Sequence, residues 1–453
     1  MAKDVTKDMT QGSPAKLILF FTLPLIAGNI FQQLYGFIDT LLVGRFLGVE
    51  ALAAVGCTGC LMFLMVGFVI GLSAGLTIIT GQRFGAKDYE GVHRSAAACL
   101  VIALVVGVVM AILGVLFSRQ LLILMQTPPE ILDGAVAFIT IISGGIPIST
   151  VFMLEGNLVR ALGDSKHPTI ILTTALIINI ILEPLFLLIF QWGIPGAAWA
   201  ILVAQGIGAI ICIAYIWLKV PVLKVRRQDF YLDWKFLKQH IMVALPMAFQ
   251  TSIIAIGAVI LQVALNGLGP VAVASYAAAQ KVETIALMPM MSFGIAMAAY
   301  TAQNYGAGKI ERISQGVKQC IYMSGSFSIL IGIFNVLLGS KLMYLFVGDG
   351  QQQVIEYGQI YLSVTGCCYW VLALQFIYRN TLQGLGKSFV PTLAGVMELI
   401  MRAVVAIWFV AGFGFLGASW ASPAAWIGSC VPLTIAYYYT MRKMHKAACK
   451  NIQ

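Results

Sequence analysis

Long apolar stretches separated by short polar connections run through the whole chain and restrict its fold more than any other feature. Only 10% of the residues are charged and 60% are hydrophobic, whereas a soluble protein carries about 25% charge. A helix that crosses a bilayer needs roughly 20 mostly apolar residues, and twelve stretches reach that length. The predicted spans are residues 17–43, 52–82, 94–117, 133–156, 168–190, 195–218, 240–266, 283–304, 317–338, 357–382, 391–412 and 418–440. The chain is therefore predicted to be an all-α polytopic membrane protein with twelve transmembrane helices.

The distribution of basic residues predicts how these helices are oriented. With twelve spans, both termini lie on the side of the connections that follow even-numbered spans, and most of the 28 Lys and Arg residues fall on that side. The opposite connections hold Arg45, Arg119, Lys281 and Lys341. Cytoplasmic loops are enriched in Lys and Arg, so we expect both termini in the cytoplasm. The net charge of +10 then reflects membrane orientation and not nucleic-acid binding.

Segments of the first half recur in the same order in the second half, at separations of 221 to 223 residues. The pairs are LPLIAGNIFQQ (23–33) with LPMAFQTSIIA (245–255), GQRFGAKD (81–88) with AQNYGAGK (302–309), GNLVRALGDSKHPT (156–169) with RNTLQGLGKSFVPT (379–392), and GIPGAAWA (193–200) with GFLGASWA (414–421). These matches predict two homologous six-helix lobes. Because six is even, both lobes enter the membrane in the same direction, related by an axis along its normal. We predict an N-lobe in residues 1–221, a cytoplasmic interlobe loop in 222–239 and a C-lobe in 240–453.

Such a duplication is typical of transporters, in which substrate lies between the halves and is exposed to each side in turn. A channel can also be duplicated, but no connection resembles a selectivity filter. A membrane enzyme would need a cluster of chemically active side chains. The four histidines fall in predicted cytoplasmic loops or the tail, without metal-ligand spacing: His93, His167, His240 and His445. We therefore predict a transporter without enzymatic activity, and a passive channel remains the less favoured alternative.

Two acidic residues lie at similar depth inside predicted spans of the first half. Asp39 falls in the outer part of the first span and Glu183 past the middle of the fifth, one turn after Asn179. A charge at the bilayer centre costs roughly 2.5–3.5 kcal/mol, so such residues indicate function. The set can hold a proton or enclose a small cation such as Na⁺, and Pro184 leaves the carbonyl of Ile180 without its helical donor. The alternative is that Asp39 reaches the outer interface while Glu183 packs against an amide.

The second half lacks this pair, since the repeat matches Asn179 with Arg402, Glu183 with Ala406 and Asp39 with Leu261. Glu398 precedes Arg402 by one helical turn, a spacing at which the two charges can pair. The two residues are either a structural ion pair or part of the substrate cavity.

Glu283 follows Lys281 at the predicted start of the eighth span and is a candidate carboxylate for a cationic substrate. Met288 and Met291 are either flexible contacts for apolar ligands or filler. Glu155 and Glu356 lie near span ends, where we expect them to reach water.

The repeated segments, together with NIILEP (179–184) and AAAQKVETIALMPM (277–290), resemble the MATE family of multidrug and toxic compound extrusion transporters, and most closely its prokaryotic DinF-like branch. The resemblance covers essentially the whole chain. It implies export of amphipathic, often cationic, molecules by alternating access, driven by H⁺ or Na⁺. In that branch the coupling-ion site consists of acids on helices 1 and 5 with an asparagine, which match Asp39, Asn179 and Glu183. Ala200 and Ile201 stand where some members carry a hydroxyl group.

The resemblance also sets expectations for partners and location. We expect a monomer in the cytoplasmic (inner) membrane of a prokaryote, in contact with lipid and small-molecule substrates but not nucleic acid, and without any cofactor beyond the coupling ion. The alternative within transport is a flippase for lipid-linked saccharides on a similar fold. A flippase cavity would carry several basic residues for pyrophosphate, whereas Arg402 is the one basic residue that we place well inside a span.

Overall fold

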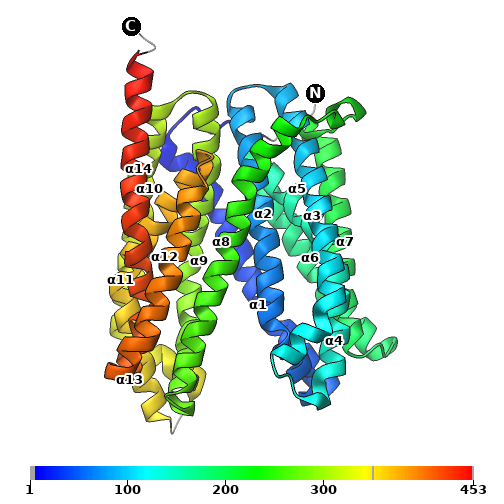
Figure 1. Cartoon of the computed structure of the whole chain (residues 1–453), viewed down its shortest axis with the longest axis vertical. Helices are drawn as coiled ribbons and strands as arrows, with labels where there is room; N and C mark the ends of the chain where they lie inside the picture. Colours follow the sequence, from blue (N-terminus) through cyan, green and yellow to red (C-terminus); the bar gives the residue numbers. More distant parts are fainter. Residues whose placement is uncertain (1–5, 349–350, 451–453) are drawn as a thin grey trace. The chain divides into compact units, whose positions relative to one another are not determined.

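The computed structural model describes residues 6–348 and 351–450, and regular structure in those ranges is helical throughout (Figure 1). The first half contains α1 (Pro14–Cys57), α2 (Gly59–Gly85), α3 (Tyr89–Leu124), α4 (Pro129–Gly144), α5 (Ile146–Ala161), α6 (Lys166–Pro184), the π-helix η1 (Leu185–Ile189) and α7 (Ile194–Lys219). The connection holds the 3₁₀ turns η2 (Pro221–Leu223) and η3 (Arg227–Phe230). The second half contains α8 (Trp234–Asn266), α9 (Pro270–Gly306), α10 (Ile310–Val347), α11 (Gln352–Gly384), α12 (Phe389–Val404), the π-helix η4 (Val405–Phe409), α13 (Val410–Ser419) and α14 (Ala421–Lys450).

Most of these helices are long and apolar enough to cross a membrane. Within the described ranges, ten segments satisfy both requirements, and α4 with α5 forms an eleventh that is bent by 49°. The predicted twelfth span, α14, is less apolar because Ser, Pro and Tyr residues dilute its aliphatic side chains, although residues 421–440 carry no charge. The predicted all-α polytopic fold is thereby confirmed.

The described part of the chain packs as two compact units. Unit 1 consists of Met1–Asp8 and Pro24–Ala248, and unit 2 of Met9–Leu23 and Phe249–Gln453. Helices α1 and α8 therefore each begin in one unit and continue in the other. This division by packing does not follow the loop at residues 222–239, and the lobes as sequence domains stay a prediction.

The backbone repeats along with the sequence. Five residues of the first half with positive φ have counterparts of positive φ in the second half, each 221 to 223 positions later: Gly48 and Gly269, Lys87 and Gly308, Gln126 and Gly348, Gly163 and Gly386, and Gly193 and Gly414. A π-helix also follows the matching helices α6 and α12. The duplication predicted from four sequence segments is therefore present in the helix ends and connections as well.

The first residues of unit 2, Met9–Gly12, form a strap across the ends of α9 and α10. The backbone N–H of Met9 donates a hydrogen bond of 2.8 Å to the Gln303 side chain. The Arg312 guanidinium donates to the carbonyl of Gly12 at 3.0 Å. These contacts fix the entry of α1 with side chains from far along the chain.

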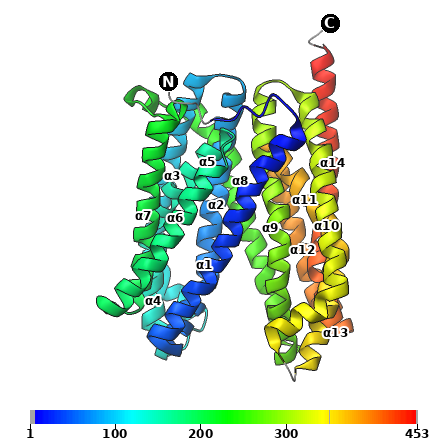
Figure 2. The ribbon, with the colours of Figure 1, turned by 180° about the vertical axis from the view of Figure 1, so that it is seen from behind.

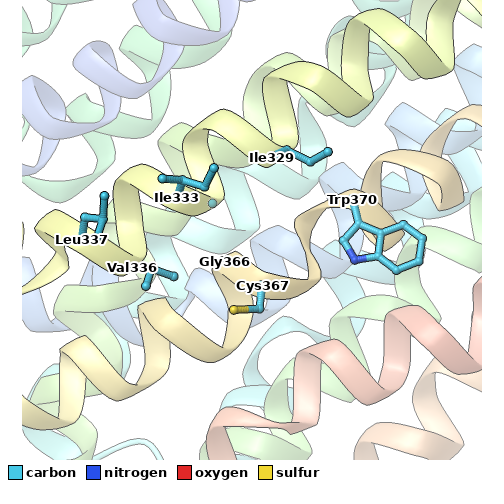
Figure 3. A pocket seen from close by; sticks show the side chains of 8 residues that line it. Ile329, Ile333, Val336, Leu337, Gly366, Cys367 and Trp370 are labelled. Carbon is cyan, nitrogen blue, oxygen red and sulfur yellow. The ribbon is translucent and has the colours of Figure 1, made fainter.

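An apolar groove of about 380 Å³ lies between α10 and α11 of unit 2 (Figure 3). Its floor is the contact of Gly332 with Gly366, where a Cβ on Gly332 would meet the carbonyl of Gly366. The side chains around it are aliphatic, apart from Cys367 and Trp370, and none is charged. This groove suits hydrocarbon, so the polar chemistry of the protein lies elsewhere.

Candidate functional site

Helices α1 and α6 lie side by side in unit 1 (Figure 2). A Cβ on Gly28 would lie 2.8 Å from the methyl group of Thr169, so the backbones approach closely there. From this contact the two helices run in the same direction through unit 1, and Asp39 follows Gly28 by 11 residues while Asn179 follows Thr169 by 10. With equal rise per residue in both helices, Asp39 is level with the Asn179–Glu183 turn of α6.

The structure brings the two predicted acids of unit 1 together. Asp39 and Glu183 interact electrostatically and lie within hydrogen-bonding reach of each other when one of them carries a proton. Tyr35, one turn before Asp39 on α1, donates a hydrogen bond of 3.2 Å to the Asp39 carboxylate. The sequence analysis did not include Tyr35, although its i, i+4 spacing from an intramembrane acid was a visible signal. The group therefore contains two carboxyls and one hydroxyl from two helices.

Asn179 and Glu183 are buried, at 3% and 1% exposure. The amide of Asn179 has no hydrogen-bond partner, and the carboxylate of Glu183 has none as long as Asp39 beside it is ionised too. A buried polar group without a partner costs about 1–3 kcal/mol, and a charged one more. Such a cost in a folded protein indicates a binding site, because a bound proton or cation removes much of it.

Pro184 shapes the backbone directly after this pair. It has no N–H, so the carbonyl of Ile180 loses its usual helical donor. The chain continues as the π-helix η1 (Leu185–Ile189), in which Phe190 N–H donates to the carbonyl of Leu185 at 3.1 Å. Wide turns of this kind often occur at functional sites. The helix therefore changes its hydrogen-bond pattern directly after Glu183.

Apolar side chains cover the pair toward the end of unit 1 at which α1 breaks at Gly48 and α7 begins, which we call the distal end. Val43 and Leu187, each one turn beyond an acid, pack together with Phe138 and Ala198. This cluster separates the acids from the distal surface.

Beyond the cluster, the distal end carries an acidic recess of about 310 Å³. The carboxylates of Glu50 and Glu130 line it, together with Leu47 and Ile194 of the same apolar cluster. The recess would attract cations. The apolar cluster lies between the recess and the two acids, Asp39 and Glu183.

The family of this chain follows from its similarity to known proteins. The family model described as MatE matches residues 24–185 and matches again at residues 246–408. The chain belongs to the MatE family. The two matched ranges begin 222 residues apart and end 223 residues apart, which is the separation of the internal repeat. The resemblance found from the sequence is thereby confirmed.

Relatives in this family cover nearly the whole chain. A probable multidrug resistance protein, YpnP of Bacillus subtilis, is 25% identical over 405 residues, which is 88% of this chain and 87% of the relative. A FAD transporter of Shewanella oneidensis is 25% identical over 397 residues, 85% of this chain and 86% of the relative. The crystal structure of MATE in complex with MaL6 has a TM-score of 0.90 at 20% identity and covers 98% of this chain and 100% of that one. This MatE protein thus shares the fold of solved MATE structures.

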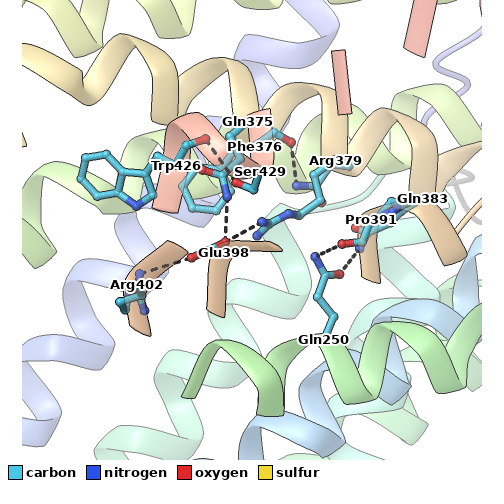
Figure 4. A network of polar contacts seen from close by, with 11 residues as sticks. Gln250, Gln375, Phe376, Arg379, Gln383, Pro391, Glu398, Arg402, Trp426 and Ser429 are labelled. Carbon is cyan, nitrogen blue, oxygen red and sulfur yellow. Dashed lines mark hydrogen bonds and ion pairs between the residues drawn. The ribbon is translucent and has the colours of Figure 1, made fainter. Parts of the chain in front are cut away.

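Unit 2 of this MatE protein contains a buried ion-pair network, shown in Figure 4. Glu398 of α12 accepts from Arg379 at 2.9 Å, from Arg402 at 3.3 Å and from Gln375 at 2.9 Å. The predicted pairing of Glu398 with Arg402 is present. The sequence analysis placed Arg402 alone among the basic residues well inside a span, which was wrong, because α11 extends to Gly384 and buries Arg379 at 7% exposure. Arg379 and Arg402 therefore both lie buried inside spans of unit 2.

Glu283 was expected at the start of its span, which was wrong. The helix α9 begins at Pro270, a residue favoured at the first helical position, and Glu283 lies well inside it at 4% exposure. The two candidate methionines differ, since Met288 is 6% exposed and Met291 is 44% exposed. They do not form one surface. Glu283 and Met288 belong to the interior of unit 2.

Two further expectations about polar residues of unit 1 were wrong. Glu155 was expected to reach water but is 6% exposed, since the bend between α4 and α5 directs α5 against α2, α3 and α7. His240 was expected in a loop but is fully buried on α8, where its ring contacts Ser95 at 2.8 Å and the carbonyl of Phe236 at 3.0 Å. Glu356 is exposed.

Proposed function

We propose that this MatE protein is a secondary active efflux transporter, an antiporter that exports amphipathic, often cationic, organic molecules in exchange for protons. The coupling site is the group formed by Asp39, Asn179 and Glu183, with Tyr35 as a further ligand. The observation that carries this assignment is the burial of Asn179 without a partner and of Glu183 beside a second carboxyl group. Cargo of this kind is supported by the names of relatives such as YpnP.

Proton exchange follows from the electrostatics of the acid pair. Two carboxylates close together in a membrane repel each other, and one proton shared between them removes the repulsion. A proton that enters through the recess at Glu50 and Glu130 must pass the apolar cluster that contains Val43 and Leu187, so loading by this route requires the cluster to open. Loading then changes the packing of α1 and releases cargo, and loss of the proton to the cytoplasm resets the protein.

The test is transport by purified protein in liposomes with an imposed pH gradient. We expect wild type to move ethidium only while the gradient persists, and Asp39→Asn and Glu183→Gln to fall to the rate of liposomes without protein. Asp133→Asn is the matched control, because Asp133 is a surface acid of the same unit with 84% of its side chain exposed.

A sodium gradient in place of the pH gradient tests the other coupling ion. The oxygens of Asp39, Asn179 and Glu183 are of the type that binds hard cations. If a sodium gradient alone drives transport, sodium replaces the proton as the proposed coupling ion. If wild type and Asp39→Asn both show flux that does not depend on a gradient, the protein is a passive channel. Undiminished coupled transport by both variants would remove the site from the mechanism.

A flavin dinucleotide is a second candidate cargo. It is favoured by the FAD transporter among the relatives and by the two arginines of unit 2 that share one carboxylate. Competition between FAD and ethidium in the same liposomes separates the two cargoes. Inhibition of ethidium transport by FAD that is lost in Arg402→Met would favour an anionic cargo.

A further inference from the structure

The connection between α7 and α8 is rich in basic residues and contributes nothing to the proposed coupling site. Residues 219–238 include six basic and two acidic residues. The 3₁₀ turns η2 and η3 of this connection contact α3. In Figure 1 the segment projects to the side at the end of α7. Its outward side chains are therefore available to whatever surrounds unit 1 at this end.

The two acidic residues of the connection hold its backbone in place. Asp229 is buried and accepts a hydrogen bond of 2.7 Å from the backbone N–H of Arg226. Asp233 accepts from the backbone N–H of Phe236 at 3.3 Å, at the start of α8. Since both carboxylates serve the fold, the outward charge of the segment is dominated by its basic residues.

The first turns of α8 have two different faces. Phe236 and His240, one helical turn apart, are buried, and the guanidinium of Arg83 lies 4.9 Å from the centre of the Phe236 ring. Trp234 and Lys238, also one turn apart, are exposed. Side chains four positions apart share a helix face. Helix α8 therefore begins with one face packed on unit 1 and an opposite face that is aromatic and basic.

Exposed aromatic and basic side chains of the connection continue this outward face. The rings of Phe230, Tyr231 and Trp234 are 45%, 84% and 69% exposed. Large rings gathered on a surface mark an interaction site. We call the exposed side chains of this segment the linker face: Arg227, Phe230, Tyr231, Trp234, Lys235 and Lys238.

The end of α7 gives the depth of the linker face in the membrane. Trp217 and Leu218 project from the last turn of this apolar helix and are exposed. Tryptophan side chains are enriched where a span leaves the hydrocarbon and enters the headgroup layer. The Nζ of Lys224 lies 5.8 Å from the centre of the Trp217 ring. The connection therefore begins at the level of the lipid headgroups.

The composition of the linker face distinguishes between its possible partners. A soluble polyanion would match the basic residues but would leave the apolar ring of Phe230 in water. A bilayer surface matches both, because basic residues bind lipid phosphates while aromatic rings enter the boundary between headgroups and acyl chains. Positive charge favours anionic phospholipids over zwitterionic ones.

We propose that the linker face binds anionic phospholipids of the adjacent membrane leaflet. Its three basic residues contact the phosphate groups, and its three rings lie among the headgroups. Helix α8 starts here in unit 1 and continues into unit 2, so bound lipid holds the first turn of a helix that both units share. The proposal holds whichever ion or cargo the transporter uses.

Hydrogen–deuterium exchange of residues 222–238 in lipid nanodiscs tests this surface. An attraction of the size typical for one Lys or Arg at an anionic surface changes an equilibrium constant by about fivefold. We therefore expect wild type to exchange at least about fivefold more slowly in nanodiscs with phosphatidylglycerol than in phosphatidylcholine alone. The combined variant Arg227→Gln, Lys235→Gln and Lys238→Gln should lose this difference.

The matched control removes three exposed basic residues from α14 instead: Arg442→Gln, Lys443→Gln and Lys446→Gln. It should keep the difference between the two lipids. A lower pH near the anionic surface would slow exchange in both combined variants alike, so the contrast between them measures binding by the linker face. High salt should reduce the difference in wild type, because it screens exposed charges.

The rings have a separate test. Tyr231→Ser with Trp234→Ser should speed exchange in both kinds of nanodisc, since ring insertion does not depend on lipid charge. Equal exchange of wild type in the two lipids, or a difference that survives in the variant without Arg227, Lys235 and Lys238, would overturn the proposal. Equal protection by polyglutamate added to phosphatidylcholine nanodiscs would also overturn it, in favour of a soluble acidic partner. Asp39→Asn should behave as wild type, so this test stands apart from that of the coupling site.

Discussion

Gly28 of α1 lies against Thr169 of α6 so closely that a Cβ on the glycine would come within 2.8 Å of the threonine methyl group. This contact sets the register in which Asp39 faces Glu183. It also predicts how substitutions of the two residues affect transport. Gly28→Ala should impair transport, since α1 must move away from α6, and overpacking of this kind costs about 1–3 kcal/mol.

Thr169→Ser removes the methyl group and keeps the hydroxyl that donates to Ser165 at 2.8 Å. The double variant should therefore recover most of the activity that Gly28→Ala loses, with a coupling energy of about 0.5–3 kcal/mol for residues in contact. Rates of gradient-driven ethidium transport by the wild type, the two single variants and the double variant give this coupling energy. Additive effects would mean that the contact does not control the site.

Tyr35→Phe tests the hydrogen bond from the tyrosine hydroxyl to Asp39. The ring and its packing stay, so the variant removes only a bond to a carboxylate, worth about 1.5–3 kcal/mol. We expect coupled transport to fall by roughly tenfold or more, as each 1.4 kcal/mol corresponds to a factor of ten. Tyr231→Phe, an exposed tyrosine of the same unit at 84% exposure, should retain the wild-type rate.

The network in unit 2 predicts an order of stabilities that depends on which partner is lost. Glu398→Gln leaves Arg379 and Arg402 buried without their common carboxylate, and such losses cost about 3–5 kcal/mol. Arg402→Met leaves Glu398 paired with Arg379. Thermal unfolding in detergent should therefore show a larger drop for Glu398→Gln than for Arg402→Met. The reverse order would mean that the network is not held by Glu398.

The contacts of Asp229, which lies in the connection between α7 and α8, predict that the stability of this connection depends on pH. Burial raises the pKa of Asp229, but hydrogen bonds from the backbone and guanidinium of Arg226 outweigh it and hold the pKa below its ordinary value. An acid whose pKa is lower in the folded than in the unfolded protein stabilises the fold. This stabilisation is fully present above the pKa of the unfolded chain, about 3.9, and is lost as the pH falls through the pKa of the folded protein.

Hydrogen–deuterium exchange of residues 222–233 measures this effect. Exchange should be slow and constant from neutral pH down to about pH 4, after correction for the intrinsic rate, and should increase below it. Asp229→Asn should exchange faster at neutral pH and lose the acid-dependent step. An identical profile in both proteins would show that Arg226 does not order this segment through Asp229.

The sequence predicted the fold and the proximity of Asp39 to Glu183 because both depend on periodic signals. Apolar length and the repeat identified the spans, and helical spacing placed Asn179 and Glu183 on one face. The α4–α5 bend was not predictable, since hydropathy does not register a change of direction within an apolar run, and Glu155 was misplaced with it.

Errors at Glu283, Arg379 and His240 share a different cause. Each residue lies in a helix that extends beyond its most apolar stretch. Hydropathy therefore placed the end of the predicted span too near to the residue. Burial of such residues depends on partners far away in sequence, for example Tyr361 for Glu283. No local pattern in a single sequence contains that information.

The strap at Met9–Gly12 has a consequence for synthesis. The N–H of Met9 pairs with a side chain 294 residues later in the chain. At about 5–20 residues per second, the ribosome needs on the order of 15–60 s to supply that partner. The strap therefore cannot close before α9 and the start of α10 have been synthesised, and the start of α1 lacks these contacts until then.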